Sequence, residues 1–165
     1  MMPLIILLLS FTLFLVLGRM TQRISANKAG RIAFGLMFVF TGVSHFTFTK
    51  GMMMSMPAFI PFKEFFVYLT GVIEVLFAVF FLMEKYKRFI ARLIIAFLIV
   101  VLPANIWAAI YHVDIPSATY TGPGLAYLWF RIPLQLFFIA WVYHFGINPI
   151  FRYSFKENRQ LNPLG

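Results

Sequence analysis

The sequence predicts an all-α, polytopic membrane protein, and three observations support that fold class. Of the 165 residues, 62% are hydrophobic and only 12% are charged, and Phe alone contributes 22. A water-soluble domain of this length could not enclose so much apolar surface in its core. The apolar residues also form long runs, which favours helices because a helix satisfies its own backbone groups in hydrocarbon.

Five apolar runs follow one another: 2–18, about 31 to at least 48, 65–83, 89–111 and 127–147. At ~1.5 Å per residue, even the shortest run crosses most of a bilayer core. We expect that first run to be a retained span, because it lacks the basic start and small-residue cleavage site of a signal peptide. The predicted parts are an N-terminal helix at 1–20, a membrane domain at 31–147 and a basic tail at 148–165.

Basic side chains collect in alternate connections, which predicts the topology. The connections after the first and third runs and the C-terminal tail are basic, whereas the other two connections carry few charges. Because basic loops stay cytoplasmic, the N-terminus is predicted to face outward and the C-terminus to lie in the cytoplasm of a bacterial inner membrane. The net charge of +9 then reflects topology and attraction to anionic lipid, so the predicted partner is the bilayer and not nucleic acid.

The chain contains no cysteine, which excludes disulfides, thiol redox chemistry and thiolate metal sites. The segment KGMMMSMPAFIPFKEF contains Pro57 and Pro61, which prevent a continuous helix, so Met52–Pro61 is expected at the outer interface or as a lid. Its Met thioethers could bind Cu(I), but adaptable packing is the favoured interpretation, because no second Met or Cys cluster exists. No metal site is predicted.

The few polar residues inside the predicted spans fall at similar depths in the outer half of the membrane: His45, Glu74, Asn105, Arg131 and Gln135. Glu74 lies ~15 Å into the third run. His45 reaches that depth only if its helix continues past Phe48 and ends before Pro57. Ionisable groups at depth are functional-site candidates by default, so His45 and Glu74 are the predicted catalytic residues.

The remaining polar residues have two interpretations. They could form interhelical hydrogen bonds, or Arg131 could extend to the outer headgroups. They could also line one ligand cavity, in which Arg131 would pair with Glu74 and Pro103 would free a carbonyl. The predicted ligand-binding residues on that interpretation are Gly42, Gly71, Asn105, Trp129, Arg131 and Gln135.

Two short repeats, TGVSH at 41–45 and TGVIE at 70–74, place a glycine three residues before each ionisable side chain. Gly42 and His45 therefore share one helix face, as do Gly71 and Glu74. A small residue on such a face lets a neighbouring backbone or a ligand come close. Coincidence is the alternative explanation.

The ordered segments GVSHF, MPAFIP, VYLTGVIE, LPANIWAAI and WFRIPLQLFFIAW resemble the DoxX-like family of small bacterial membrane proteins over about residues 31–147. The resemblance implies a four-helix transmembrane bundle, to which the first run would add one extra N-terminal transmembrane helix. It also implies a link to thiosulfate:quinone oxidoreduction or to membrane redox complexes, and distant relatives are receptor-assembly chaperones. It assigns no settled catalytic role to any residue.

Three functions compete. The first is a quinone-linked redox subunit or small-molecule-binding protein, with a ring under the outer aromatics, His45 and Glu74 handling protons, and Arg131 or Gln135 holding a carbonyl oxygen. The chain has no redox centre of its own, so it would need a redox partner protein; quinone is the candidate cofactor, and homo-oligomerisation stays open. The alternatives are a membrane assembly or scaffold protein without catalysis, and a small-molecule or metal transporter, which would lack the usual paired half-helices.

Overall fold

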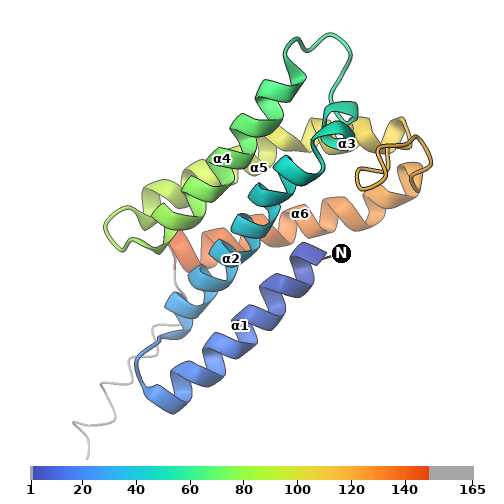
Figure 1. The fold of residues 1–165 in the computed structure, drawn as a ribbon. Coiled ribbons are helices and arrows are strands. Elements are labelled where there is room, and N and C mark those ends of the chain that lie inside the picture. The colour runs from blue at the N-terminus through green and yellow to red at the C-terminus, as the bar shows by residue number, and fades with distance from the viewer. Residues whose placement is uncertain (1, 149–165) are drawn as a thin grey trace, which may run out of the picture.

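The computed structural model describes residues 2–148 and confirms the all-α class (Figure 1). The elements are α1 (Met2–Thr21), α2 (Ala26–Thr47), α3 (Thr49–Met54), α4 (Lys63–Leu82), α5 (Lys87–Ile110), the short helix η1 (Gly124–Tyr127), α6 (Leu128–Val142) and the π-helical turn η2 (Tyr143–Ile147). The predicted basic tail beyond residue 148 lies outside the described residues.

Five of these helical stretches are long and apolar enough to cross a membrane. They are α1, α2, α4, α5 and the continuous stretch Gly124–Ile147, which combines η1, α6 and η2. Their outward faces carry many exposed large apolar side chains, an arrangement suited to lipid rather than water. The chain is therefore a polytopic α-helical membrane protein, as predicted.

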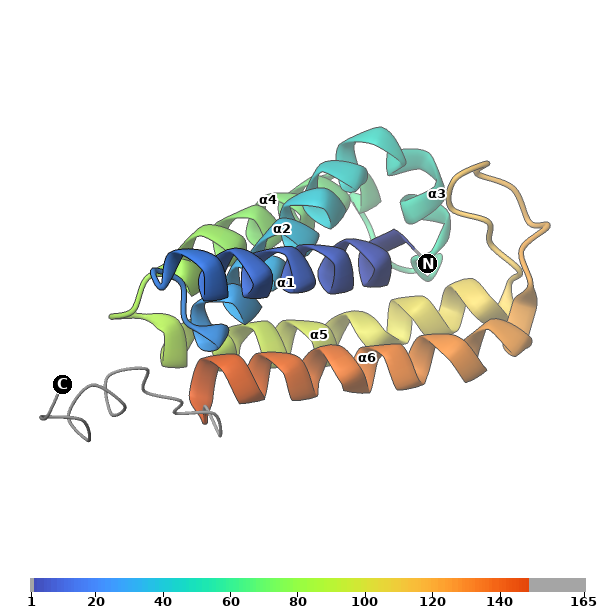
Figure 2. The same ribbon diagram turned by 90° about the horizontal axis from the view of Figure 1, so that it is seen from below.

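The helices form two layers (Figure 2). Helices α1, α2 and α4 lie side by side with α2 in the middle, and α5 and α6 run along them as the second layer. Helices α2, α4, α5 and α6 make the four-helix bundle, and α1 packs along α2 as the extra helix. Aromatic rings join the layers, because Phe34 of α2 contacts Phe81 of α4 and Phe138 of α6 at centroid distances of 5.9 and 6.3 Å.

A small ion-pair network holds the end of the bundle that is predicted to be cytoplasmic. The Arg31 side chain of α2 is only 2% exposed and donates to Glu84 in the α4–α5 connection, and Lys87 Nζ donates to the same carboxylate at 2.6 Å. The Arg31 guanidinium, with help from Lys87, holds the pKa of the Glu84 carboxyl below its usual range. The network therefore links the start of α2 to the start of α5.

At the opposite end, α2 ends at Thr47, so the prediction that this helix continues to just before Pro57 is wrong. Phe48 leaves helical geometry (φ −112°, ψ 31°), and the chain turns into α3, which packs against α4. The predicted depths assumed that all helices begin at the same level in the membrane. In the structure the His45 ring lies beside Val67, in the second turn of α4, so α4 begins about one turn before the level of His45.

Candidate functional site

His45 and Glu74 meet between α2 and α4, even though α2 is shorter than predicted. The two side chains are largely buried, with exposures of 16% and 12%, and His45 Nε2 lies 3.6 Å from Glu74 Oε1. The other ring nitrogen, Nδ1, lies 3.0 Å from the Val67 carbonyl oxygen. The imidazole therefore lies along α4, with one nitrogen toward the backbone and the other toward the carboxyl group.

These contacts assign the protons of the pair. A carbonyl oxygen can only accept, so Nδ1 carries a hydrogen and donates it to Val67. If Nε2 were unprotonated and Glu74 ionised, a lone pair would face a negative oxygen. A proton on either Nε2 or the carboxyl group removes that repulsion and leaves the pair with no net charge, which is the least costly state inside hydrocarbon.

Thr70 completes this cluster, and the sequence interpretation overlooked it. Its hydroxyl donates within α4 to the Phe66 and Val67 carbonyls at 2.8 and 2.9 Å, so its lone pair is left for His45 Nδ1 at 3.1 Å. The clue was available, because Thr70 begins the TGVIE repeat, one helical turn before Glu74. Thr70 helps to keep the imidazole tautomer that carries its hydrogen on Nδ1.

One oxygen of the pair has no partner among the residues that the structure describes. Glu74 Oε2 is buried and accepts no hydrogen bond from residues 2–148. A buried carboxylate oxygen without a donor is costly, so it is a natural acceptor for a donor that arrives with a ligand. The pair can therefore both exchange a proton and accept a hydrogen bond.

Gly42 and Gly71 do not supply open space beside the pair; the neighbouring helix fills that space. A Cβ atom added to Gly42 would lie 2.8 Å from the Gly71 carbonyl oxygen, and one added to Gly71 would lie 2.8 Å from His45 Cβ. The TGV repeats were predicted to allow close approach of either a neighbouring backbone or a ligand. The structure shows the first, because the backbones of α2 and α4 approach closely at these glycines. Their assignment to a ligand stays a prediction.

Arg131 does not pair with Glu74, which corrects the predicted ion pair. Within residues 2–148, the ion-pair partner of Glu74 is His45, and Arg131 Nε is buried without a hydrogen-bond partner. Arg131 and Asn105 instead line a separate cavity of about 90 Å³ between α5, the 111–123 connection and the start of α6. The two residues were expected at the depth of Glu74, and depth alone did not reveal which helix faces meet.

Gln135 is a helix-to-helix contact. The side chain is 4% exposed, and its amide donates to the Leu98 carbonyl of α5. Leu98 lies a little more than one turn before Pro103, which stays inside a continuous α5 and does not end it. This geometry matches the interhelical hydrogen-bond interpretation of Gln135.

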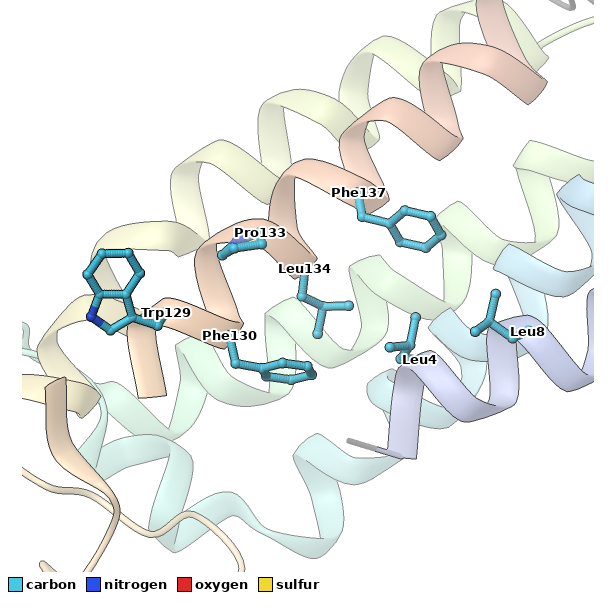
Figure 3. A pocket seen from close by; sticks show the side chains of 7 residues that line it. All are labelled: Leu4, Leu8, Trp129, Phe130, Pro133, Leu134 and Phe137. Atoms are coloured by element: carbon cyan, nitrogen blue, oxygen red, sulfur yellow. The ribbon is translucent and has the colours of Figure 1, made fainter. Parts of the chain in front are cut away.

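Trp129 lies in a third place (Figure 3). It is 87% exposed and stands at one end of an apolar groove of about 370 Å³ between α1 and α6. Aromatic and aliphatic side chains line the groove: Leu4, Leu8, Trp129, Phe130, Pro133, Leu134 and Phe137. Neither this groove nor the 90 Å³ cavity is lined by His45 or Glu74, so the single capped cavity that was predicted is divided among three places.

The model of a family described as Domain of unknown function (DUF8561) matches residues 34–146, about two thirds of the chain. The chain belongs to this family. Comparison with curated proteins and with solved structures finds no match.

The DUF8561 region contains the four-helix bundle apart from the first turns of α2, and it contains every polar residue of the candidate site. The His45–Glu74 pair, Thr70 and the Arg131 cavity therefore all belong to the family domain. Helix α1 lies outside the matched region. Leu4 and Leu8 therefore line one side of the apolar groove that is not part of the DUF8561 region.

Proposed function

We propose that this DUF8561 protein is the quinone-binding subunit of a membrane oxidoreductase, and that the His45–Glu74 pair exchanges a proton with the ligand. One observation carries the proposal: the His45–Glu74 pair, in the outer half of the predicted membrane span, has a buried carboxylate oxygen, Glu74 Oε2, with no donor among residues 2–148. A quinol hydroxyl is a donor of the right kind, and hydrocarbon is where quinols reside.

The proton step is simple to balance. A quinol oxidised to a quinone releases two protons and two electrons. With His45 as imidazolium and Glu74 as carboxylate, Oε2 accepts the hydrogen bond and then the first proton, and the second proton leaves to the outer water. Both electrons pass to a redox centre of a partner protein, because this chain supplies acid–base groups and no cysteine.

Two further features support this proposal. The order of motifs from GVSHF to WFRIPLQLFFIAW resembles DoxX-like proteins, and that resemblance favours quinone-linked redox chemistry. The carbon-lined groove at α1 and α6 offers room for hydrocarbon in the same half of the span as the pair. We infer a DoxX-like relationship and a bacterial inner-membrane location on these grounds.

The assembly or scaffold function is the second candidate, and the α2–α4 crossing favours it. Gly42 and Gly71 bring two backbones into contact, and the His45 side chain packs against Gly71. A polar pair at such a crossing can serve only to lock two helices together. The two candidates differ in what the loss of the Glu74 charge does to ligand binding.

The test is binding of a short-chain ubiquinone and its quinol to the purified full chain in detergent. Glu74→Gln keeps the side-chain shape and removes the proton-accepting carboxylate. We expect quinol affinity to fall at least ~10-fold, the equivalent of one hydrogen bond to a charged group. Glu64→Gln is the matched control, because Glu64 is an exposed carboxylate on the same helix and should leave affinity unchanged.

A spectroscopic readout makes the test specific. Infrared difference spectra between the quinol-bound and quinone-bound protein should contain a carboxyl C=O band that disappears in Glu74→Gln. If the variant binds quinol like the wild type, and the band is unchanged, the redox proposal is wrong. Loss of thermal stability in Glu74→Gln and His45→Ala, without ligand binding by the wild type, would put the scaffold function first.

A further inference from the structure

We propose that the cavity beside Arg131 is a second binding site, which takes a small oxyanion group such as a carboxylate, phosphate or sulfate. The site is separate from His45 and Glu74 and does not depend on the quinone proposal. It lies at the predicted outer end of the bundle, where α5 ends, α6 begins and the 111–123 connection passes over them. Four steps support it.

The first step is enclosure. The cavity of about 90 Å³ is lined by Asn105 from α5, by Val113, Ile115 and Pro123 from the connection, and by Tyr127 and Arg131 from the α6 end. The connection is held in a turn over the cavity, because Asp114 and Thr119 exchange backbone hydrogen bonds of 2.8 and 3.3 Å. The walls are therefore built by the fold and are not a passing gap between side chains.

The second step is charge. Arg131 Nε is buried without an acceptor, and Arg131 forms no ion pair within residues 2–148. Each carboxylate in that range is engaged elsewhere: Glu64 with Tyr68, Glu74 with His45, Glu84 with Arg31 and Lys87, and Asp114 with Ser117. A guanidinium in a membrane span without a counter-ion is costly, so an anionic group supplied by a ligand would remove that cost.

The third step is the set of donors. Arg131 presents a planar fork that matches the two oxygens of a carboxylate or phosphate. One N–H of the Asn105 amide is committed to the Val101 carbonyl at 3.2 Å, and the amide carries a second N–H. The N-terminal end of the η1–α6 stretch, at Gly124, also borders the cavity and contributes its partial positive charge.

The fourth step is size. A cavity of about 90 Å³ exceeds several-fold the ~10–15 Å³ that one water molecule requires. It suits one compact oxyanion group better than a substituted ring with a tail. That group could belong to a soluble anion from the outer aqueous phase or to the phosphate of an outer-leaflet lipid. The chemistry recognised by Arg131 is the same in both cases.

The experiment measures thermal unfolding of the delipidated full chain in detergent. Sodium sulfate, phosphate and acetate are compared with sodium chloride at equal ionic strength, and a second arm adds a short-chain phosphatidylglycerol below its micellar concentration. We expect at least one probe to raise the unfolding temperature beyond chloride, and Arg131→Gln to weaken that response at least ~10-fold, as the loss of a charged hydrogen bond implies. Arg19→Gln is the control, because Arg19 is an exposed arginine near the C-terminal end of α1. This variant should respond like the wild type.

The result distinguishes a soluble anion from a lipid headgroup. A response to the free anions alone indicates a soluble ligand, and a response to the lipid alone indicates a headgroup. A second measurement needs no variant: the bound probe should protect Arg131 from phenylglyoxal modification, as read by peptide mass spectrometry. Unchanged modification, or an Arg131→Gln response equal to that of the wild type in both arms, would overturn the site. Glu74→Gln should keep the anion response, which distinguishes failure of this site from failure of the quinone proposal.

Discussion

Replacing Gly42 with Ala tests the close approach of α2 and α4. The added methyl carbon would lie 2.8 Å from the Gly71 carbonyl oxygen and 2.8 Å from Val75 Cγ2. Val75 can rotate, but the Gly71 carbonyl belongs to the backbone of α4, so the two helices must move apart. Overpacking of this kind costs ~1–3 kcal/mol. The greater helix preference of Ala offsets ~0.5–1 kcal/mol, which leaves a net loss of about 0–2.5 kcal/mol.

Gly35→Ala is the matched control, because Gly35 lies on the same helix and faces the same partner. Its added carbon would lie 3.4 Å from the Ala78 carbonyl oxygen, an ordinary contact. This variant should be as stable as the wild type or up to ~1 kcal/mol more stable. The two variants should therefore differ by about 1–3 kcal/mol although their chemical change is identical.

Thermal unfolding in a mild detergent, followed by circular dichroism, measures the difference. At about 2–4 °C per kcal/mol for a chain of this size, the two variants should be separated by several degrees. Gly42→Ala and Gly71→Ala combined should cost less than the sum of the single changes, because one separation of the helices relieves both clashes. Equal unfolding temperatures for Gly42→Ala and Gly35→Ala would show that α2 and α4 do not approach as described.

Three further outcomes are expected. Glu84→Gln should lower stability near neutral pH by ~1–2 kcal/mol, discounted for the exposure of Glu84, because the buried Arg31 guanidinium loses its anionic acceptor. The folded-state pKa of Glu84 is lowered, so the carboxylate should stabilise the wild type fully above the ordinary carboxyl pKa. This stabilisation should be lost as the pH falls through the lowered pKa, and below it the wild type should be no more stable than the variant. A double-mutant cycle on unfolding should give coupling of ~0.5–3 kcal/mol between His45 and Glu74 and none between Arg131 and Glu74. A periplasm-dependent reporter fused to the C-terminus should be inactive, and an active one would reverse the predicted topology.

The helices were predictable because the physical signal is long and repeated. Runs such as 65–83 and 89–111 differ from α4 (Lys63–Leu82) and α5 (Lys87–Ile110) by one or two residues at each end. Hydrophobic length determines a span, and no knowledge of neighbouring helices is needed. The end of α2 was missed for the opposite reason, because the turn at Phe48 depends on the packing of α3 against α4.

The candidate site was only partly predictable, because depth along a helix is one coordinate and rotation about its axis is another. His45 and Glu74 meet because each lies on a face that a glycine at i−3 opens to its neighbour. Arg131 has a comparable predicted depth but faces α5 and the 111–123 connection. Single-sequence spacing gives the face of each helix, and it does not say which faces pack together.

The structural and chemical roles of the α2–α4 crossing are therefore not independent. An ionised carboxylate deep in a bilayer costs ~2.5–3.5 kcal/mol unless a partner shares its charge. The partner, His45, can lie against α4 only because Gly71 has no side chain, since an added Cβ would lie 2.8 Å from His45 Cβ and 3.2 Å from Cγ. The close packing that a scaffold would need is thus also what brings the imidazole to Glu74, whose Oε2 is left without a donor among residues 2–148. A wider crossing would separate the pair, and Glu74 would be costly to retain. The glycines and the ionisable residues of the two TGV repeats thus form a single unit.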